Sequence, residues 1–164
     1  MIPKPIDPSA TTTAVWSGDE AIDRSQSPKQ TPEQIRTYLA NPGMWKERFK
    51  LVNGKQPTIF QIGHIPAGRM NELEDLYGST ERGVPMKRLY WACFIEGLTD
   101  IKNVPVGEVP KISRYGRDYV DPEWLEQVFA GRSEGNVSLR HCAQEIGMYA
   151  YTWNNPMGVD VKNS

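Results

Sequence analysis

The chain has 164 residues, of which 19 are basic and 20 are acidic, so its net charge is −1. This balance excludes a strong overall field that would recruit nucleic acid or anionic lipid. No run of about 18 apolar residues exists that could cross a membrane. We predict one α+β domain, mainly α-helical, with a small antiparallel β-hairpin and a flexible or extended N-terminal arm.

Residues 1–30 differ in composition from the rest of the chain. Prolines at positions 3, 5, 8 and 28 stand among Ser, Thr, Asp and Lys, and no helical or alternating period holds. Such a composition predicts the arm, with Trp16 and Ile22 as its points of contact. The arm is either a disordered tail or a segment that becomes ordered on a neighbouring subunit. We assign residues 31–164 to a single domain.

The first helix is predicted to begin after Thr31. Thr31 can cap the helix, Pro32 suits its first position, and Gln34 completes a capping box. Asn41, followed by proline and glycine, ends it.

A β-hairpin is predicted next. Residues 45–52 alternate charged and apolar side chains, as a strand with one wet face does, and residues 58–62 form the return strand. Asn53-Gly54 supplies the positive φ angles of a tight turn, although the residues that follow favour a looser loop.

Two helices are predicted to follow the hairpin. Apolar residues recur at helical spacing over residues 70–77, and Gly78 ends that helix. The next helix spans residues 85–96 and is apolar on nearly all sides from 89 to 95, which favours the central helix of the core.

The last third of the chain is predicted to hold a loop and two helices. Residues 102–120 are broken by glycine and proline and are interpreted as a long irregular loop. Asp121 and the proline after it begin a helix with an apolar stripe over residues 124–129. The final helix carries apolar residues on one face from 139 to 153.

The two cysteines, Cys93 and Cys142, both lie in apolar helical patterns. We expect reduced core thiols in a cytoplasmic protein. A Cys93–Cys142 disulfide is the alternative.

The residues that carry most enzyme chemistry are sparse. His64 and His141 are the only histidines, and His141 and Cys142 point about 100° apart on a helix, so they cannot share one metal ion. Acidic residues at 72–75 are better explained as the wet face of a helix, and Asp121 as a cap. We therefore predict no catalytic, metal-binding or cofactor-binding residue, no cofactor, and a protein that is not an enzyme.

Residues 111–119 mix basic and aromatic side chains, as single-strand nucleic-acid binders do. Asp118 and Asp121 offset that charge, so a structural or protein-contact loop is favoured over nucleic-acid binding.

The order of elements resembles the tail assembly chaperones of long-tailed bacteriophages. The resemblance covers about residues 44–164. It is carried by Pro57-Thr-Ile-Phe-Gln-Ile62, an amphipathic helix from Arg69 to Tyr77, an apolar helix ending in Gly97-Leu-Thr-Asp-Ile-Lys-Asn103, and the tail Val161-Lys-Asn-Ser164. The N-terminal arm and the 102–120 loop have no counterpart in that pattern.

The resemblance implies a non-enzymatic protein of the host cytoplasm. Such chaperones bind the tape-measure protein, recruit tail-tube subunits, self-associate, and are generally absent from the finished particle. The candidate contact residues are Trp16 in the arm and Trp45, Phe60, Ile62, Trp124 and Phe129 in the domain. The alternative for each is a place in the core.

Two other function classes are consistent with the sequence. The first is a structural virion protein, a head–tail or tail component whose N-terminal arm docks on neighbouring subunits. The second is a small host-directed binding protein or an enzyme, which a tight pocket with a perturbed carboxylate or histidine would support.

Overall fold

The computed structural model describes residues 7–26, 29–78, 86–105, 107–135 and 137–155. The expectations that concern Pro85 and the tail at 161–164 lie outside these residues. In chain order the elements are β1 (Thr12–Val15), α1 (Pro32–Ala40), η1 (Pro42–Met44), α2 (Trp45–Arg48), β2 (Ile59–Ile62), α3 (Ala67–Tyr77), α4 (Lys87–Gly97), β3 (Leu98–Lys102), β4 (Lys111–Arg114), β5 (Arg117–Val120), α5 (Pro122–Phe129) and α6 (Leu139–Asn154).

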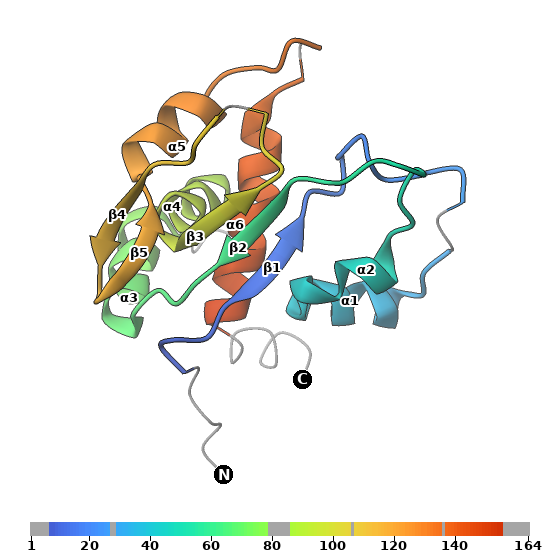
Figure 1. Ribbon diagram of the computed structural model, residues 1–164. Coiled ribbons are helices and arrows are strands. Elements are labelled where there is room, and N and C mark those ends of the chain that lie inside the picture. The colour runs from blue at the N-terminus through green and yellow to red at the C-terminus, as the bar shows by residue number, and fades with distance from the viewer. Residues whose placement is uncertain (1–6, 27–28, 79–85, 106, 136, 156–164) are drawn as a thin grey trace.

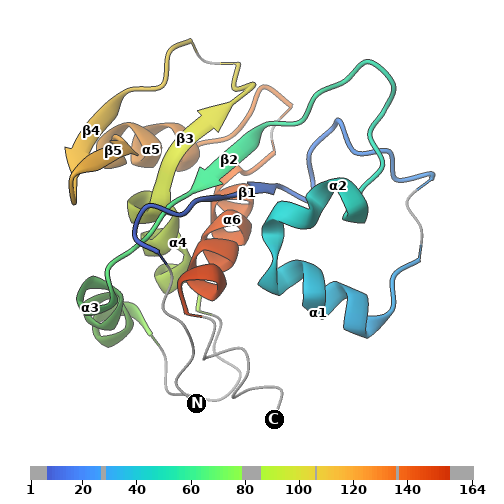
Figure 2. The same ribbon diagram turned by 60° about the horizontal axis from the view of Figure 1, so that its bottom comes forward.

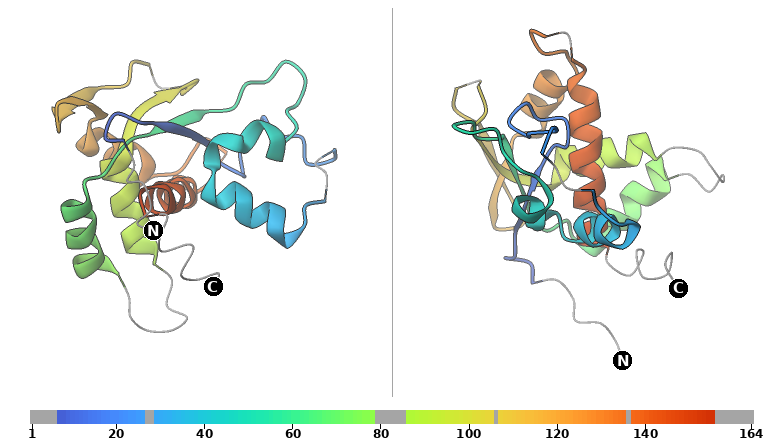
Figure 3. Two further views of the ribbon diagram at one scale, coloured as in Figure 1. Left: turned by 90° about the horizontal axis from the view of Figure 1, so that it is seen from below. Right: turned by 90° about the vertical axis from the view of Figure 1, so that its right-hand side faces the viewer.

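The predicted α+β class is confirmed, and the elements form two layers. An antiparallel sheet in the order β1-β2-β3 lies over α4 and α6 (Figure 1). Figure 2 shows both helices on the same side of this sheet. In Figure 3, α3 flanks the layers at one end, and α1 and α2 lie at the opposite end.

The central strand β2 supplies the sheet's contribution to the core. Its side chains alternate, so Phe60 and Ile62 are buried while Ile59 and Gln61 are partly exposed. Phe60 lies opposite Ala14 of β1 and Ile101 of β3, both of which are also buried. One apolar side chain from each strand thus faces the helices.

The helices α4 and α6 cross at unusually short range. A Cβ atom added to Gly147 of α6 would lie 1.8 Å from the carbonyl oxygen of Tyr90 in α4. Only glycine permits this approach. The α4 face at the crossing is fully apolar and includes Leu89, Cys93 and Phe94.

The N-terminal segment is part of the domain, so the boundary predicted at residue 30 is wrong for the described part of the arm. Strand β1 pairs with β2 over its whole length. Ala14, Val15 and Ile22 are buried, and the Ser17 backbone N–H donates to a Glu145 carboxylate oxygen of α6 at 2.6 Å. The strand is not evident from the sequence because it is short and pairs with distant residues, from Thr12 with Ile62 to Val15 with Ile59.

Residues 45–52 do not form the predicted strand. Pro42 begins a 3₁₀ turn that continues into α2, and Phe49 N–H closes that helix on the Trp45 carbonyl at 2.9 Å. Leu51 makes one isolated bridge, to Ile22. A turn does form after it, closed by Lys55 N–H donating to the Val52 carbonyl at 3.0 Å. Only Gly54, with a φ of 81°, takes the positive angle that was predicted for both Asn53 and Gly54.

The predicted loop at 102–120 contains regular structure, so that prediction is also wrong. β3 ends at Lys102, and β4 and β5 form a tight antiparallel hairpin. Its two turn residues, Tyr115 and Gly116, have φ angles of 54° and 76°, as a type I′ turn requires. Tyrosine is a rare first residue for this turn, which is why the pattern conceals it.

The predicted helix starts are confirmed where a cap was recognised. Gln34 N–H donates to the Thr31 hydroxyl at 3.1 Å, and the Gln34 side chain accepts from Thr31 N–H at 2.9 Å. Asp121 accepts from Glu123 N–H at 3.0 Å. None of the helices in the described ranges is long and apolar enough to cross a membrane.

Both cysteines are free and buried, as expected, and they form no disulfide. Burial raises the pKa of the Cys93 thiol to about 12. Its sulfur lies 4.0 Å from that of Met70, so the contact joins α3 to α4. Buried neutral thiols of this kind act as small apolar side chains.

His64, between β2 and α3, makes stability depend on pH. Burial, and then the charge of Arg117, lower the pKa of the imidazole below its ordinary value, and Nδ1 has no hydrogen-bond partner among the described residues. The unfolded chain therefore takes up a proton near pH 6.5 that the folded chain resists.

We expect unfolding free energy to fall as the pH drops through about 6.5, and His64→Gln to remove part of that fall. Urea unfolding of the wild type and of His64→Gln at about pH 7 and about pH 5 measures the fall in unfolding free energy of each protein. Identical pH dependence of the two proteins would contradict this assignment.

Candidate protein-binding groove

The residues predicted to form a contact surface are mostly core residues. Phe60, Ile62, Trp45 and Phe129 are at most 6% exposed, so their prediction as surface contacts is wrong. Trp16 and Trp124 are half-buried against the same core. Phe60 and Phe129 are buried because they meet Phe94 in a central aromatic cluster, where the Phe94 ring lies 6.1 Å from Phe60 and 4.9 Å from Phe129. Trp45 is buried in a second cluster with Val15 and Ile22.

Two of the exposed apolar side chains lie next to each other at the C-terminal end of α3. Leu76 is 65% exposed and Tyr77 is 42% exposed. Tyr77 forms part of the wall of a groove of about 370 Å³ that is open to solvent. This volume lies in the lower part of the range of ligand pockets, about 300–1,000 Å³.

The floor of the groove is the solvent-facing side of α4. Lys87, Trp91 and Ile95 follow one another at intervals of four residues, and Arg88 and Ala92 lie beside them. The part of α4 that lines the groove, from Lys87 to Glu96, is about 14 Å long at 1.5 Å per residue. Glu126 of α5 and two α6 side chains, Arg140 and Gln144, complete the lining.

Trp91 is the largest apolar side chain in the groove. Its ring is half-buried, and it rests on Phe94 with 6.1 Å between ring centroids. The Arg140 guanidinium lies 5.4 Å from the Trp91 ring centroid. The ring is thus held on one side by the core while its groove side remains accessible.

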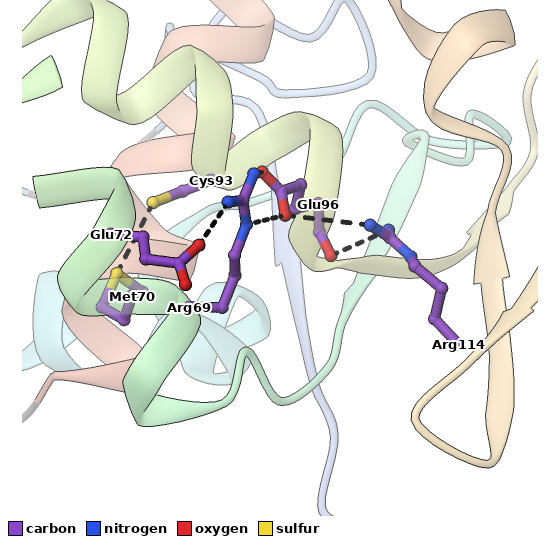
Figure 4. Close-up of polar contacts among 6 residues, drawn as sticks. All are labelled: Arg69, Met70, Glu72, Cys93, Glu96 and Arg114. Atoms are coloured by element: carbon purple, nitrogen blue, oxygen red, sulfur yellow. Dashed lines mark hydrogen bonds and ion pairs between the residues drawn. The ribbon is translucent and has the colours of Figure 1, made fainter. Parts of the chain in front are cut away.

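Glu96, which lines the groove, belongs to the ion-pair cluster shown in Figure 4. Arg69 of α3 binds both Glu96 carboxylate oxygens, through Nε at 2.8 Å and Nη2 at 2.9 Å. Arg114 of β4 donates to the Glu96 backbone carbonyl at 3.2 Å, and its guanidinium lies 3.8 Å from the carboxylate. The bonds to Glu96 and to Glu72 raise the pKa of Arg69. The contacts of Glu96 with Arg69 and Arg114 join α3, α4 and the β4–β5 hairpin.

Replacing Glu96 with glutamine is expected to destabilise the fold by about 1–2 kcal/mol. Glu96 is 15% exposed. Its replacement leaves Arg114 without an ion-pair partner among the described residues, and leaves Arg69, which is 35% exposed and partly screened by water, with Glu72 alone. Glu72→Gln is the matched control, because Glu72 bonds to the same arginine but is 65% exposed. Thermal unfolding measures the loss of stability in both variants. An equal loss in Glu96→Gln and Glu72→Gln would contradict the stabilising role assigned to Glu96.

The remaining charges of the groove are predominantly basic. Glu96 is neutralised by Arg69 and Arg114. Within the described part of the chain, no ion pair involves Lys87, Arg88, Arg140 or Glu126. Three cations therefore face one carboxylate around an apolar floor.

A second hollow, of about 620 Å³, follows the connection from β3 to β4. It is larger, but none of the described residues that line it is aromatic. Two of them, Asp100 and Lys111, form an ion pair at 3.2 Å. The groove on α4 has the better set of binding side chains.

The polar network around Glu145 joins α6 to Ser17 and to Arg48 of α2. Glu145 accepts hydrogen bonds from Ser17 and from the Tyr149 hydroxyl, and the Arg48 guanidinium donates to that hydroxyl at 3.0 Å. Burial raises the pKa of Tyr149 to about 12. The adjacent cavity is only about 10 Å³, too small for a substrate.

Among the described residues, no group of three or more His, Cys, Asp or Glu side chains could hold a metal ion. The sequence does contain a signal for the groove, since Lys87, Trp91 and Ile95 share one side of the predicted helix. That signal was hidden because the same helix is apolar on nearly every side. No family model, curated protein or solved structure matched this chain.

Proposed function

We propose that this chain is a non-enzymatic tail assembly chaperone of a long-tailed bacteriophage, and that it binds the tape-measure protein through the groove on α4. The resemblance over residues 44–164 supports the chaperone function. The groove on α4 supports the binding of a client protein, and it is the observation on which the proposal mainly rests.

The groove has the composition of a protein-binding site. Tryptophan, tyrosine and arginine supply most of the binding energy in protein interfaces, and the groove lining includes Trp91, Tyr77, Arg88 and Arg140. Its length of about 14 Å matches the rise between residues i and i+7 of a helix, about 10.5 Å, with room at the ends. An amphipathic client helix would place its apolar side chains along Trp91 and Ile95.

The size of the groove suits a temporary contact. A chaperone must cover apolar client surface during assembly and release it afterwards, so its contact needs moderate affinity. A groove of about 370 Å³ buries few client side chains at once. Several copies along a long helical client would then bind by repetition of one weak contact.

The alternative of a structural virion protein relied on an N-terminal arm that docks on neighbours. The described part of that arm pairs with β2 of the same chain, and Val15 and Ile22 fill the chain's own core. This leaves the chaperone as the better-supported proposal.

Quantitative mass spectrometry of infected-cell lysate and of purified particles distinguishes the two functions. A chaperone is expected to be abundant in lysate and absent from particles. Retention in particles at a fixed copy number would contradict the proposal and identify a structural component.

A further inference from the structure

We infer that the groove on α4 selects an acidic amphipathic helix, one whose apolar side chains are flanked by carboxylates on the same face. That the groove binds the client is taken from the proposed function, on which this inference rests. The charge of the preferred client follows from the groove itself.

The first support is the charge around the apolar floor. Three cations line the groove, Lys87, Arg88 and Arg140, against one carboxylate outside the ion-pair cluster, Glu126. All four residues are exposed. Within the described part of the chain, none of them forms an ion pair. The groove therefore offers positive charge that a bound partner can neutralise.

This positive charge is local to the groove. The whole chain has a net charge of −1, so no overall attraction favours an anionic partner. Salt limits the reach of the exposed cations to about 10 Å at about 0.1 M. The carboxylates of the partner must therefore lie on the part of it that enters the groove.

The cations also indicate where those carboxylates lie. Lys87 and Arg88 precede Trp91 by four and three residues in α4, so they are its neighbours one turn away. The Arg140 guanidinium lies 5.4 Å from the Trp91 ring centroid. In the other direction the floor continues to Ile95, about 6 Å along the helix.

A partner helix with two apolar side chains four residues apart matches this spacing. One of them would cover Ile95 and the other Trp91. Carboxylates one turn beyond the second would then meet Lys87 and Arg88, where charged hydrogen bonds to a guanidinium are strong. The groove thus combines an apolar contact with a charged one at a fixed distance.

Single-stranded nucleic acid is the other anionic partner that basic and aromatic side chains bind. Its bases need an open aromatic face on which to stack. The Trp91 ring already lies 6.1 Å from the Phe94 ring, and the Arg140 guanidinium lies over it. These two contacts favour a peptide partner over a nucleic acid.

The test is the binding of synthetic helical peptides to the full chain, measured by fluorescence anisotropy. The acidic peptide carries two leucines four residues apart and glutamates one turn away on the same face. Two control peptides carry glutamines or lysines in place of the glutamates. In low salt the acidic peptide is expected to bind at least about tenfold more tightly than the glutamine peptide, and the lysine peptide more weakly than either.

The advantage of the acidic peptide is expected to shrink in about 0.5 M salt, because salt screens exposed charges. Equal affinity for the acidic and glutamine peptides in low salt, or a higher affinity for the lysine peptide, would overturn the inference. So would an acidic peptide that does not bind at up to about 1 mM.

Arg88→Glu tests whether the selectivity belongs to the groove. Arg88 is exposed, so the variant is expected to fold normally, to bind the acidic peptide at least about tenfold more weakly, and to bind the glutamine peptide nearly as the wild type does. Arg36→Glu is the matched control, because Arg36 is also exposed on a helix, α1, and does not line the groove. If both variants weaken the acidic peptide equally, net charge alone explains the preference and the inference fails.

An oligothymidylate distinguishes the two anionic partners. It is expected to leave the acidic peptide bound in low salt. Displacement of the peptide by the oligonucleotide, with loss of oligonucleotide binding in Arg88→Glu, would identify a nucleic-acid site and overturn the choice of partner.

These measurements fail separately from the proposed function. A chain that is absent from particles but binds the acidic and glutamine peptides equally would refute the acidic preference and leave the chaperone intact. A chain that prefers the acidic peptide but is retained in particles would keep the selectivity of the groove and contradict the chaperone.

Discussion

Replacing Gly147 with alanine is expected to destabilise the protein by at least about 3 kcal/mol. The new Cβ atom would lie 1.8 Å from the Tyr90 carbonyl oxygen and 2.6 Å from its carbon, both of them backbone atoms of α4. No side-chain rotation relieves such a clash, so α4 and α6 must move apart. Thermal unfolding is expected to show a midpoint lower by about 6–12 °C.

Gly68→Ala is the matched control for this variant. Gly68 also lies in a helix, α3, but an added Cβ would meet nothing within 4 Å. Alanine there is expected to stabilise the protein, by up to about 1 kcal/mol, because it favours the helix. A Gly147→Ala protein within about 1 kcal/mol of the wild type would contradict the close helix crossing.

Removing the N-terminal segment is expected to abolish cooperative folding. A chain that begins at Lys29 lacks β1 and the buried side chains of Val15 and Ile22, each of which contributes about 1.5–3 kcal/mol. It also uncovers one edge of β2 and the apolar surface around Trp45. The combined loss exceeds about 5 kcal/mol, comparable with the whole stability of many domains.

Circular dichroism during thermal unfolding measures the truncated chain, and a peptide added in trans provides the control. A peptide of residues 7–26 is expected to restore a cooperative transition, whereas a scrambled peptide of the same composition is not. A truncated chain that unfolds cooperatively near the wild-type temperature would show that β1 is dispensable.

The elements that the sequence predicted well are those whose signals are local. Thr31 and Asp121 begin helices through bonds to backbone groups two or three residues away, and both caps are confirmed. The amphipathic period of α3 is likewise complete within its own eleven residues. These features need no knowledge of the rest of the chain.

The features that sequence reasoning missed depend on distant partners. β1 is four residues long and becomes a strand only because β2 lies beside it. Trp45 belongs to a charged, alternating stretch that suits a strand, but Pro42 sets a helical turn just before it. Short strands and short helices have little intrinsic preference, so tertiary contacts decide between them.

The candidate site was missed for a related reason. Phe60 and Phe129 are large apolar residues near turns and helix ends, which a sequence pattern cannot separate from surface contacts. Phe60 meets Phe94 in the core because the sheet covers α4, and Phe129 reaches Phe94 from the end of α5. Trp91 belongs to the same apolar helix but lies on its open side, and only the packing of α3, α5 and α6 reveals that side.

The central claim is that this groove keeps an apolar client soluble. The most direct test is co-expression with the tape-measure protein of the same phage, followed by measurement of the soluble fraction of that client. The groove variant combines Tyr77→Ala with Arg88→Glu, both at exposed positions. Its control combines Tyr115→Ala with Lys55→Glu, which are also exposed but lie outside the groove.

The wild-type and control proteins are expected to keep the client soluble and to co-purify with it, while the groove variant leaves most of it in the pellet. Precipitation of the client in the presence of the wild-type protein would contradict the chaperone function. A client that stays equally soluble with the groove variant would show that the binding surface lies elsewhere.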